Sequence, residues 1–116
     1  MEDCIFCKIS KKEISTEVLF ENNEVIAFYD VKPIVPVHVL VIPKRHISSV
    51  TEISEKDSNL MGQLIFSATE IAKKLGVSKD GYKLLFRAGK NGGQEVPHIH
   101  LHLLGGAELY EEIRIK

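Results

Sequence analysis

Three histidines stand on alternate residues near the end of this 116-residue chain, in the segment HIHLHLLGG at 98–106. Alternate residues of a β-strand point to the same face, so His98, His100 and His102 are expected to form a row of imidazoles. Such a row suits two kinds of chemistry. Alternate histidines chelate zinc in an open catalytic site, or a neutral imidazole attacks phosphorus while its neighbours hold the phosphate oxygens. The glycines at 92 and 93 favour phosphate, because glycine lets backbone N–H groups approach an anion closely.

The two cysteines, Cys4 and Cys7, are separated by two residues in CIFC. In a chain without secretory features, this spacing is typical of a metal half-site or of a redox pair. Redox pairs of the thioredoxin type lie where a strand runs into a helix, and only three residues precede Cys4. The sequence therefore favours metal binding, with two small buried hydrophobic residues as the structural alternative.

Composition indicates a small soluble domain. The apolar content of 44% is enough for a packed core, and the length predicts one domain over residues 1–116. A formal net charge of −1 gives no basic excess for nucleic-acid binding, and no apolar run is long enough to cross a membrane. The opening Met-Glu-Asp lacks the basic and apolar segments of a secretory signal, so the sequence predicts a cytoplasmic protein.

The elements that must position the histidines are a sheet and one long helix. Runs rich in apolar residues predict five strands, at 17–21, 25–30, 38–43, 83–88 and 98–104. Apolar residues at helical spacing predict a helix over about 55–75, which begins with a capping-box-like pair at Ser54 and Asp57. CIFCKISKK predicts a short N-terminal helix. The sequence thus predicts an α+β domain, with the long helix on one face of an antiparallel sheet and the histidines on the other.

Several motifs together resemble the histidine-triad (HIT) superfamily. The run from His98 to Leu104 is similar to its signature of histidines alternating with apolar residues, and the other motifs follow in the family's order: CIFCKI, AFYD at 27–30, PVHVLVIPKRHI at 36–47 and GGQEVPHIHLHLLGG at 92–106. The resemblance covers nearly the whole chain and is closest to the Hint branch. It implies a HIT-like fold, a homodimer, and an enzyme that hydrolyses purine nucleoside monophosphate derivatives such as phosphoramidates and acyl adenylates.

The resemblance also implies a role for each motif residue. His100 is expected to attack the α-phosphorus and form a covalent nucleotidyl-histidine, with its other ring nitrogen held by a main-chain carbonyl. His102 is expected to hold phosphate oxygens, His38 to complete the cluster, and Asp30 to accept both ribose hydroxyls. The other expected nucleotide-binding residues are an apolar slot around the base and two residues of the Gly-rich loop: Ile5, Phe6, Ile9, Phe28, Val31, Gly93 and Gln94. Each apolar member, taken singly, suits the core as well as the slot.

Some members of the family carry a structural zinc ion. The resemblance implies one zinc per chain in a closed tetrahedral site with four ligands, Cys4, Cys7, His46 and His98. Two roles then fall on His98, because alternation also places it in the row with His100. Either an irregular start of the strand at Pro97 or a zinc that borders the active site accounts for both roles.

Two residues depart from the Hint pattern. Glu95 stands where the family usually has Ser, and an ionised carboxylate donates no hydrogen bond, so we expect a different leaving-group preference. Arg87 stands where Asn is common; we interpret it as a solvent-exposed strand residue in preference to a phosphate ligand. Three alternative functions stay open: a dinucleoside polyphosphate hydrolase as in the Fhit branch, a nucleotide-binding module with weak catalysis, and a zinc-dependent hydrolase.

Overall fold

The structure is a computed structural model that describes residues 3–116, and Met1 and Glu2 lie outside the described residues. Its elements, in chain order, are α1 (Ile5–Ser10), β1 (Val18–Glu21), β2 (Val25–Tyr29), β3 (Val37–Pro43), the 3-10 turns η1 (Val50–Glu52) and η2 (Glu55–Asp57), α2 (Ser58–Lys74), β4 (Tyr82–Leu85) and β5 (Leu101–Gly105). All neighbouring strands are antiparallel, in the order β1-β2-β3-β5-β4. The predicted α+β class and five-stranded sheet are confirmed.

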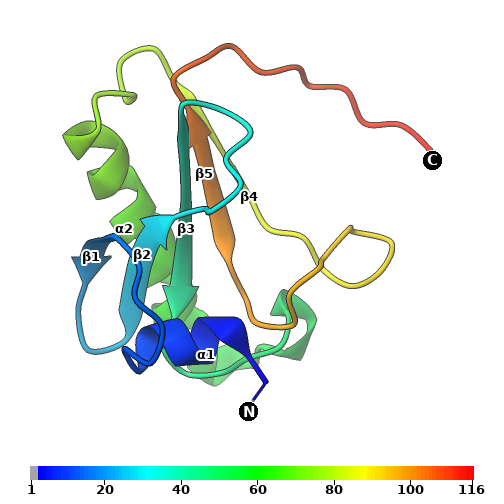
Figure 1. Cartoon of the computed structure of the whole chain (residues 1–116). Helices are drawn as coiled ribbons and strands as arrows, with labels where there is room; N and C mark the ends of the chain where they lie inside the picture. Colours follow the sequence, from blue (N-terminus) through cyan, green and yellow to red (C-terminus); the bar gives the residue numbers. More distant parts are fainter. Residues whose placement is uncertain (1–2) are drawn as a thin grey trace.

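A different helix covers each face of the sheet, α1 in front and α2 behind in the view of Figure 1. The buried side chains of α2 share the larger core with alternate residues of the strands, including Leu64, Ala68, Ile71, Val39, Val41, Leu101 and Leu103. The short helix α1 packs on the opposite face, in a second cluster of Phe6, Ile9, Ile26, Phe28, Leu40 and Ile42. Because side chains alternate along β3 and β5, His38 and His102 face α1. The histidines therefore lie opposite the long helix, as the pattern predicts.

The last strand begins later than the sequence suggests. β5 starts at Leu101, so the prediction of a strand over 98–104 is wrong for its first three residues. The Ile99 N–H donates to Ile47 O (2.7 Å), which ties this segment to the loop after β3. The carbonyl of Pro43, the last residue of β3, accepts a hydrogen bond from the His98 ring (2.8 Å). A side chain thus occupies a backbone acceptor at the end of β3.

The start of the long helical segment depends on Asp57, as the capping-box pattern predicts. The Ser54 N–H donates to the Asp57 carboxylate (2.9 Å), and the Arg45 guanidinium pairs with the same side chain, which is 7% exposed. The Ser54 N–H and the Arg45 guanidinium hold the pKa of Asp57 below its ordinary value. One carboxylate therefore joins the segment after β3 to the start of α2.

We predict that Asp57→Asn lowers the melting temperature at neutral pH, because it removes the charge that Arg45 and the Ser54 N–H stabilise. A carboxylate with a lowered pKa contributes stability above its unfolded-state pKa and loses it as the pH falls through the folded-state value. The difference from wild type should therefore shrink in acid. Thermal unfolding across pH checks this, with Glu55→Gln as the control because Glu55 is an exposed carboxylate in the same turn. Equal effects of the two substitutions contradict the assignment.

Candidate functional site

The five histidines lie in one continuous band on the α1 side of the sheet. Their ring centroids are 5.0 Å apart for His46 and His98, 4.9 Å for His100 and His102, and 5.3 Å for His102 and His38. The ring of Phe6, from α1, fills the space between His98 and His100, with centroids 5.8 and 5.2 Å away. Phe6 therefore divides the band into two groups, one with the cysteines and one with Asp30. The group with the cysteines, called the metal group below, borders the group with Asp30, and β5 also starts irregularly after His98. Both explanations given for the two roles of His98 therefore apply.

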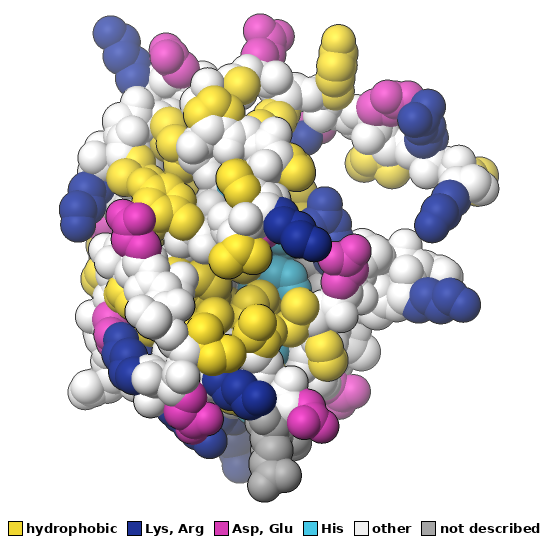
Figure 2. All heavy atoms as spheres, viewed as in Figure 1, with side chains coloured by type: hydrophobic (Ala, Val, Ile, Leu, Met, Phe, Trp, Pro, Cys, Tyr) yellow, Lys and Arg dark blue, Asp and Glu magenta, His cyan; other side chains and the backbone are white. Residues whose placement is uncertain are grey.

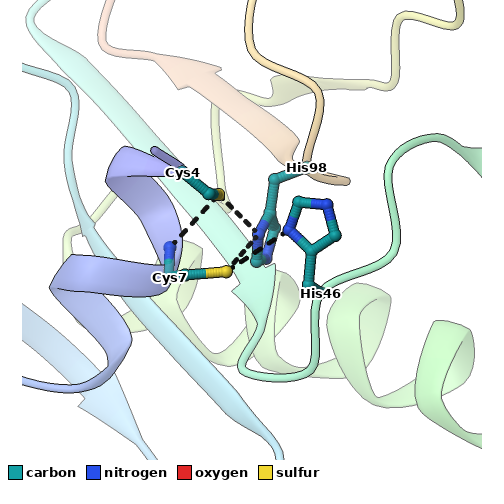
Figure 3. A group of neighbouring side chains, drawn as sticks. All are labelled: Cys4, Cys7, His46 and His98. Atoms are coloured by element: carbon teal, nitrogen blue, oxygen red, sulfur yellow. Dashed lines mark hydrogen bonds between the residues drawn. The ribbon is translucent and has the colours of Figure 1, made fainter. Parts of the chain in front are cut away.

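The first group brings together the four residues named as zinc ligands, and Figure 3 shows the cysteines of α1 directed at the two rings. The Cys4 Sγ lies 3.2 Å from His98 Nδ1, and the Cys7 Sγ lies 3.3 Å from His46 Nδ1 and 3.6 Å from His98 Nδ1. A tetrahedral zinc ion, with Zn–S of about 2.3 Å and Zn–N of about 2.0 Å, places sulfur and nitrogen about 3.5 Å apart. The donor set and its spacing therefore fit a metal ion such as zinc.

Local structure prepares these residues for a metal. Cys4 caps α1, its sulfur accepting the Cys7 N–H (3.3 Å), and the spacing of three residues puts both thiols on one side of the helix. The His98 Nε2–H donates to Pro43 O, which leaves the lone pair of Nδ1 facing the sulfurs. His98 is 0% exposed, and burial lowers its pKa to about 4. The ring is therefore neutral, as a metal ligand must be.

The second group contains the proposed nucleophile. The His100 Nδ1–H donates to the carbonyl oxygen of His98 (2.8 Å), so the main-chain acceptor expected for this ring is that of its neighbour in the row. This bond places the proton on Nδ1 and leaves a lone pair on Nε2. Burial lowers the pKa of His100, which keeps the imidazole neutral and able to act as a nucleophile.

His102, His38 and Asp30 continue the group toward the end of β2. The His38 Nε2 lies 3.0 Å from His102 Nδ1 and 3.3 Å from the Asp30 carboxylate. The other oxygen of Asp30 accepts the Lys32 N–H (2.8 Å), which fixes the carboxylate at the strand end. Burial lowers the pKa of both histidines, that of His102 to about 4. Two neutral imidazoles therefore lie beside one carboxylate.

Arg87 lies beside the histidine band. It is exposed, as interpreted, but it lies beyond the end of β4, and its guanidinium is 3.1 Å from His102 Nε2. Leu85 pairs with His102 across the sheet, so the residue two positions later is directed to the same side. The pairing of β4 with β5 therefore brings Arg87 to the histidine band.

The residues expected around the base fall into two sets. Phe6, Ile9 and Phe28 are buried in the α1 cluster, whereas Ile5 and Val31 are 47% and 87% exposed. Figure 2 shows apolar side chains around a visible histidine on this face, with basic and acidic side chains at the border. The buried set supports α1 on the sheet, and only the exposed set offers free apolar surface.

The side chain of Gln94, which was expected to bind the nucleotide at its phosphate or leaving group, holds the Gly-rich loop. Its Oε1 accepts the Gly89 N–H (3.0 Å), and its Nε2 donates to Ser48 O (2.6 Å) and Val96 O (2.9 Å). A side chain at Gly92 would collide with the backbone of Ala88, so this glycine serves close packing. The amide of Gln94 therefore bonds to backbone groups in the structure, and it positions the loop.

We predict that Gln94→Glu lowers the melting temperature, because a carboxylate cannot donate to the Ser48 and Val96 carbonyls. Loss of these two bonds releases the loop from the Ser48 segment, so amide hydrogen exchange at Gly89 should also become faster, although the carboxylate can still accept the Gly89 N–H. Glu95→Gln, which changes an exposed neighbour in the opposite sense, serves as the control and should leave both measurements near wild type. A Gln94→Glu protein with wild-type melting and impaired nucleotide binding would instead place the amide at the ligand.

Comparison with known proteins agrees with the geometry. A family model described as HIT domain matches residues 11–109. The purine nucleoside phosphoramidase of Escherichia coli (strain K12) is 41% identical over 108 residues, which cover 93% of this chain and 91% of that protein. A HIT family hydrolase from Legionella pneumophila is 43% identical, with a TM-score of 0.92 over 94% of this chain and 97% of that chain. A histidine triad protein from Clostridium difficile is 37% identical, with a TM-score of 0.94 over 97% and 98%.

Fold and site together define a small α+β protein that carries a band of histidines on one face of its sheet. The chain belongs to the HIT family, and it is a hydrolase of that family, so both predictions are confirmed. Within residues 3–116, no helix is long and apolar enough to cross a membrane. The cytoplasmic location and the homodimer stay predictions.

Proposed function

We propose that the protein is a nucleoside 5′-monophosphate phosphoramidase that acts through a covalent intermediate on His100. The observation that carries this proposal is the hydrogen bond from His100 Nδ1 to His98 O (2.8 Å), because it leaves the Nε2 lone pair free to attack phosphorus. The name of the Escherichia coli relative, purine nucleoside phosphoramidase, supports a purine nucleoside and a P–N bond as the substrate features.

The reaction has two displacements at phosphorus. In the first, His100 Nε2 bonds to the α-phosphorus, the P–N bond breaks, and the departing nitrogen takes a proton and leaves as the amine. His100 then carries phosphorus on Nε2 and a proton on Nδ1, and the His98 carbonyl stabilises its positive charge. In the second, water attacks phosphorus, gives up a proton, and the P–Nε2 bond breaks. The nucleoside monophosphate leaves, and neutral His100 is restored.

The neighbours of His100 suit the rest of a nucleotide. His102, with its ring centroid 4.9 Å from that of His100, is placed to hold non-bridging phosphate oxygens as charge builds on them. Asp30 keeps free lone pairs for the two ribose hydroxyls beside its bond to the Lys32 N–H. The exposed apolar side chains of Ile5 and Val31 offer surface for the base, and Phe6 and Phe28 support it from beneath.

We predict that His100→Ala reduces hydrolysis of adenosine 5′-phosphoramidate by about three orders of magnitude or more, because the nucleophile is lost. Initial rates from chromatography of the products measure this. Acid quenching during turnover, followed by mass spectrometry, should find wild type heavier by one adenylyl group, attached within the peptide that contains His100. The His100→Ala protein should show no such species.

Three results would contradict the proposal in distinct ways. Wild-type rates in His100→Ala exclude the covalent route. Cleavage of a dinucleoside polyphosphate without cleavage of the phosphoramidate assigns the protein to that substrate class. Tight binding of AMP without turnover of either substrate assigns it as a nucleotide-binding module.

We propose that the metal group holds one structural zinc ion per chain, supported by the fit of its four donors to tetrahedral geometry. When bound, zinc supplies a crosslink between α1, the segment after β3 and the segment before β5. No open coordination position remains for water, so the reaction does not need the metal's chemistry.

Metal analysis of the purified protein should therefore find one equivalent of zinc, and Cys7→Ser should lose it and lower the melting temperature. His38→Gln is the matched control, because His38 belongs to the other histidine group, which also offers three possible metal ligands. Zinc that survives Cys7→Ser but is lost in His38→Gln would move the metal to the nucleotide group and favour a metal-dependent hydrolase.

A further inference from the structure

We propose that Arg87 is a substrate-binding residue, and that its guanidinium and the Nε2–H of His102 together hold one non-bridging oxygen of the substrate phosphate. The inference rests on the proposed function, because the phosphate is that of the bound nucleotide. The evidence for it is a chain of hydrogen-bonding groups, from the Ile34 N–H through His38 and His102 to Arg87, in which one acceptor is missing.

The chain runs through two imidazoles. The Ile34 N–H lies 3.3 Å from His38 Nδ1, His38 Nε2 lies 3.0 Å from His102 Nδ1, and His102 Nε2 lies 3.1 Å from the Arg87 guanidinium. The groups at the two ends, a backbone N–H and a guanidinium, are donors only. Each of the two imidazoles between them offers one donor and one acceptor when neutral.

The protons in this chain do not match its contacts. His38 Nδ1 accepts from Ile34, so the proton of neutral His38 is on Nε2. If the proton of His102 is on Nδ1, it faces the Nε2–H of His38. If it is on Nε2, it faces the N–H of Arg87. Either way two donors oppose each other. His38 and His102 are 4% and 7% exposed, and an unsatisfied donor is costly at such buried positions.

The Asp30 carboxylate does not remove the mismatch. It lies 3.3 Å from His38 Nε2 and can accept a hydrogen bond from the N–H there. Even then, a hydrogen on His102 Nδ1 would face the hydrogen on His38 Nε2. A hydrogen on His102 Nε2 would face an N–H of the Arg87 guanidinium. The acceptor that the chain lacks must therefore enter at His102.

A phosphate oxygen between Arg87 and His102 satisfies every group. It accepts from the guanidinium and from His102 Nε2–H, and His102 Nδ1 then accepts from His38 Nε2–H. The guanidinium charge meets an anion, which makes the new bond charge-assisted. A neutral ligand without such an oxygen leaves the mismatch in place, so the site selects for the phosphate of a nucleotide over a nucleoside.

The Gly-rich loop keeps Arg87 at this position. Gly93 has a φ of 79°, and a Cβ there would lie 3.6 Å from Cδ and 3.8 Å from Nε of Arg87. The loop backbone thus runs along the aliphatic part of the arginine. Its guanidinium is directed to His102, although the residue is exposed.

Titration calorimetry with AMP and with adenosine tests the inference. In Arg87→Gln, we expect the affinity for AMP to fall about 10- to 100-fold, as for loss of a hydrogen bond to a charged group, and the affinity for adenosine to stay within about twofold. Lys90→Gln removes an equal charge from an exposed position of the same loop and should change neither affinity. Arg87→Lys keeps the charge without the planar fork and should give an intermediate loss for AMP.

The ligand-free proteins provide a second measurement. The side-chain oxygen of glutamine can accept from His102 Nε2–H, so Arg87→Gln should melt at or above the wild-type temperature. Equal losses for AMP and adenosine, or a lower melting temperature, would show a structural role and overturn the inference, as would unchanged AMP affinity.

The same experiment separates this inference from the proposed function. Wild type that binds AMP but does not hydrolyse the phosphoramidate contradicts the proposed function, and the AMP-to-adenosine comparison still decides the role of Arg87. Wild type that does not bind AMP contradicts both.

Discussion

The hydrogen bond from His100 to the carbonyl of His98 fixes the His100 ring to a fully buried residue of the α1 face. The His98 ring donates to Pro43 O and faces two thiols. The main-chain carbonyl of the same residue accepts the hydrogen bond that orients His100. A six-residue helix such as α1 is not stable alone, so the Phe6 contacts and the two cysteines hold it on the sheet. The placement of the His100 ring therefore depends on the docking of α1, whose Phe6 ring contacts it.

Much of the fold follows from periodicity in the sequence. Alternation along β3 and β5 and helical spacing along α2 are strong local patterns, and they place His38 and His102 on the face away from α2. Side chains still alternate between the two faces at residues 98–100, but strand pairing is absent there, because the Pro43 carbonyl accepts from the His98 side chain and the Ile99 N–H bonds to the loop at Ile47. These contacts join segments far apart in the chain, and no local pattern encodes them.

The site was less accessible to sequence reasoning than the fold. The spacing of Cys4 and Cys7 indicated a metal, but only the family resemblance joined them to His46 and His98, which folding brings within 4.8 Å. Gln94 was expected at the phosphate or leaving group, and the structure adds a role that the sequence did not indicate, because its amide makes three backbone hydrogen bonds. Loop side chains follow tertiary contacts, which local sequence does not encode. The same is true of the register that pairs Leu85 with His102 and so brings Arg87 beside this ring.

The position of β5 has a consequence for biosynthesis. It is the last strand in the chain, yet it lies between β3 and β4. The segment just before it carries His98, which contacts Cys4, 94 positions earlier in the chain. Until this strand emerges from the ribosome, β3 lacks a partner on one side, β4 lacks its strand partner altogether, and His98, His100 and His102 are absent. Such distant pairing is slow, and it leaves strand edges open to other chains in the meantime. A nascent chain therefore gains β5, the cluster of Cys4, Cys7, His46 and His98, and the ring of His100 in one late step.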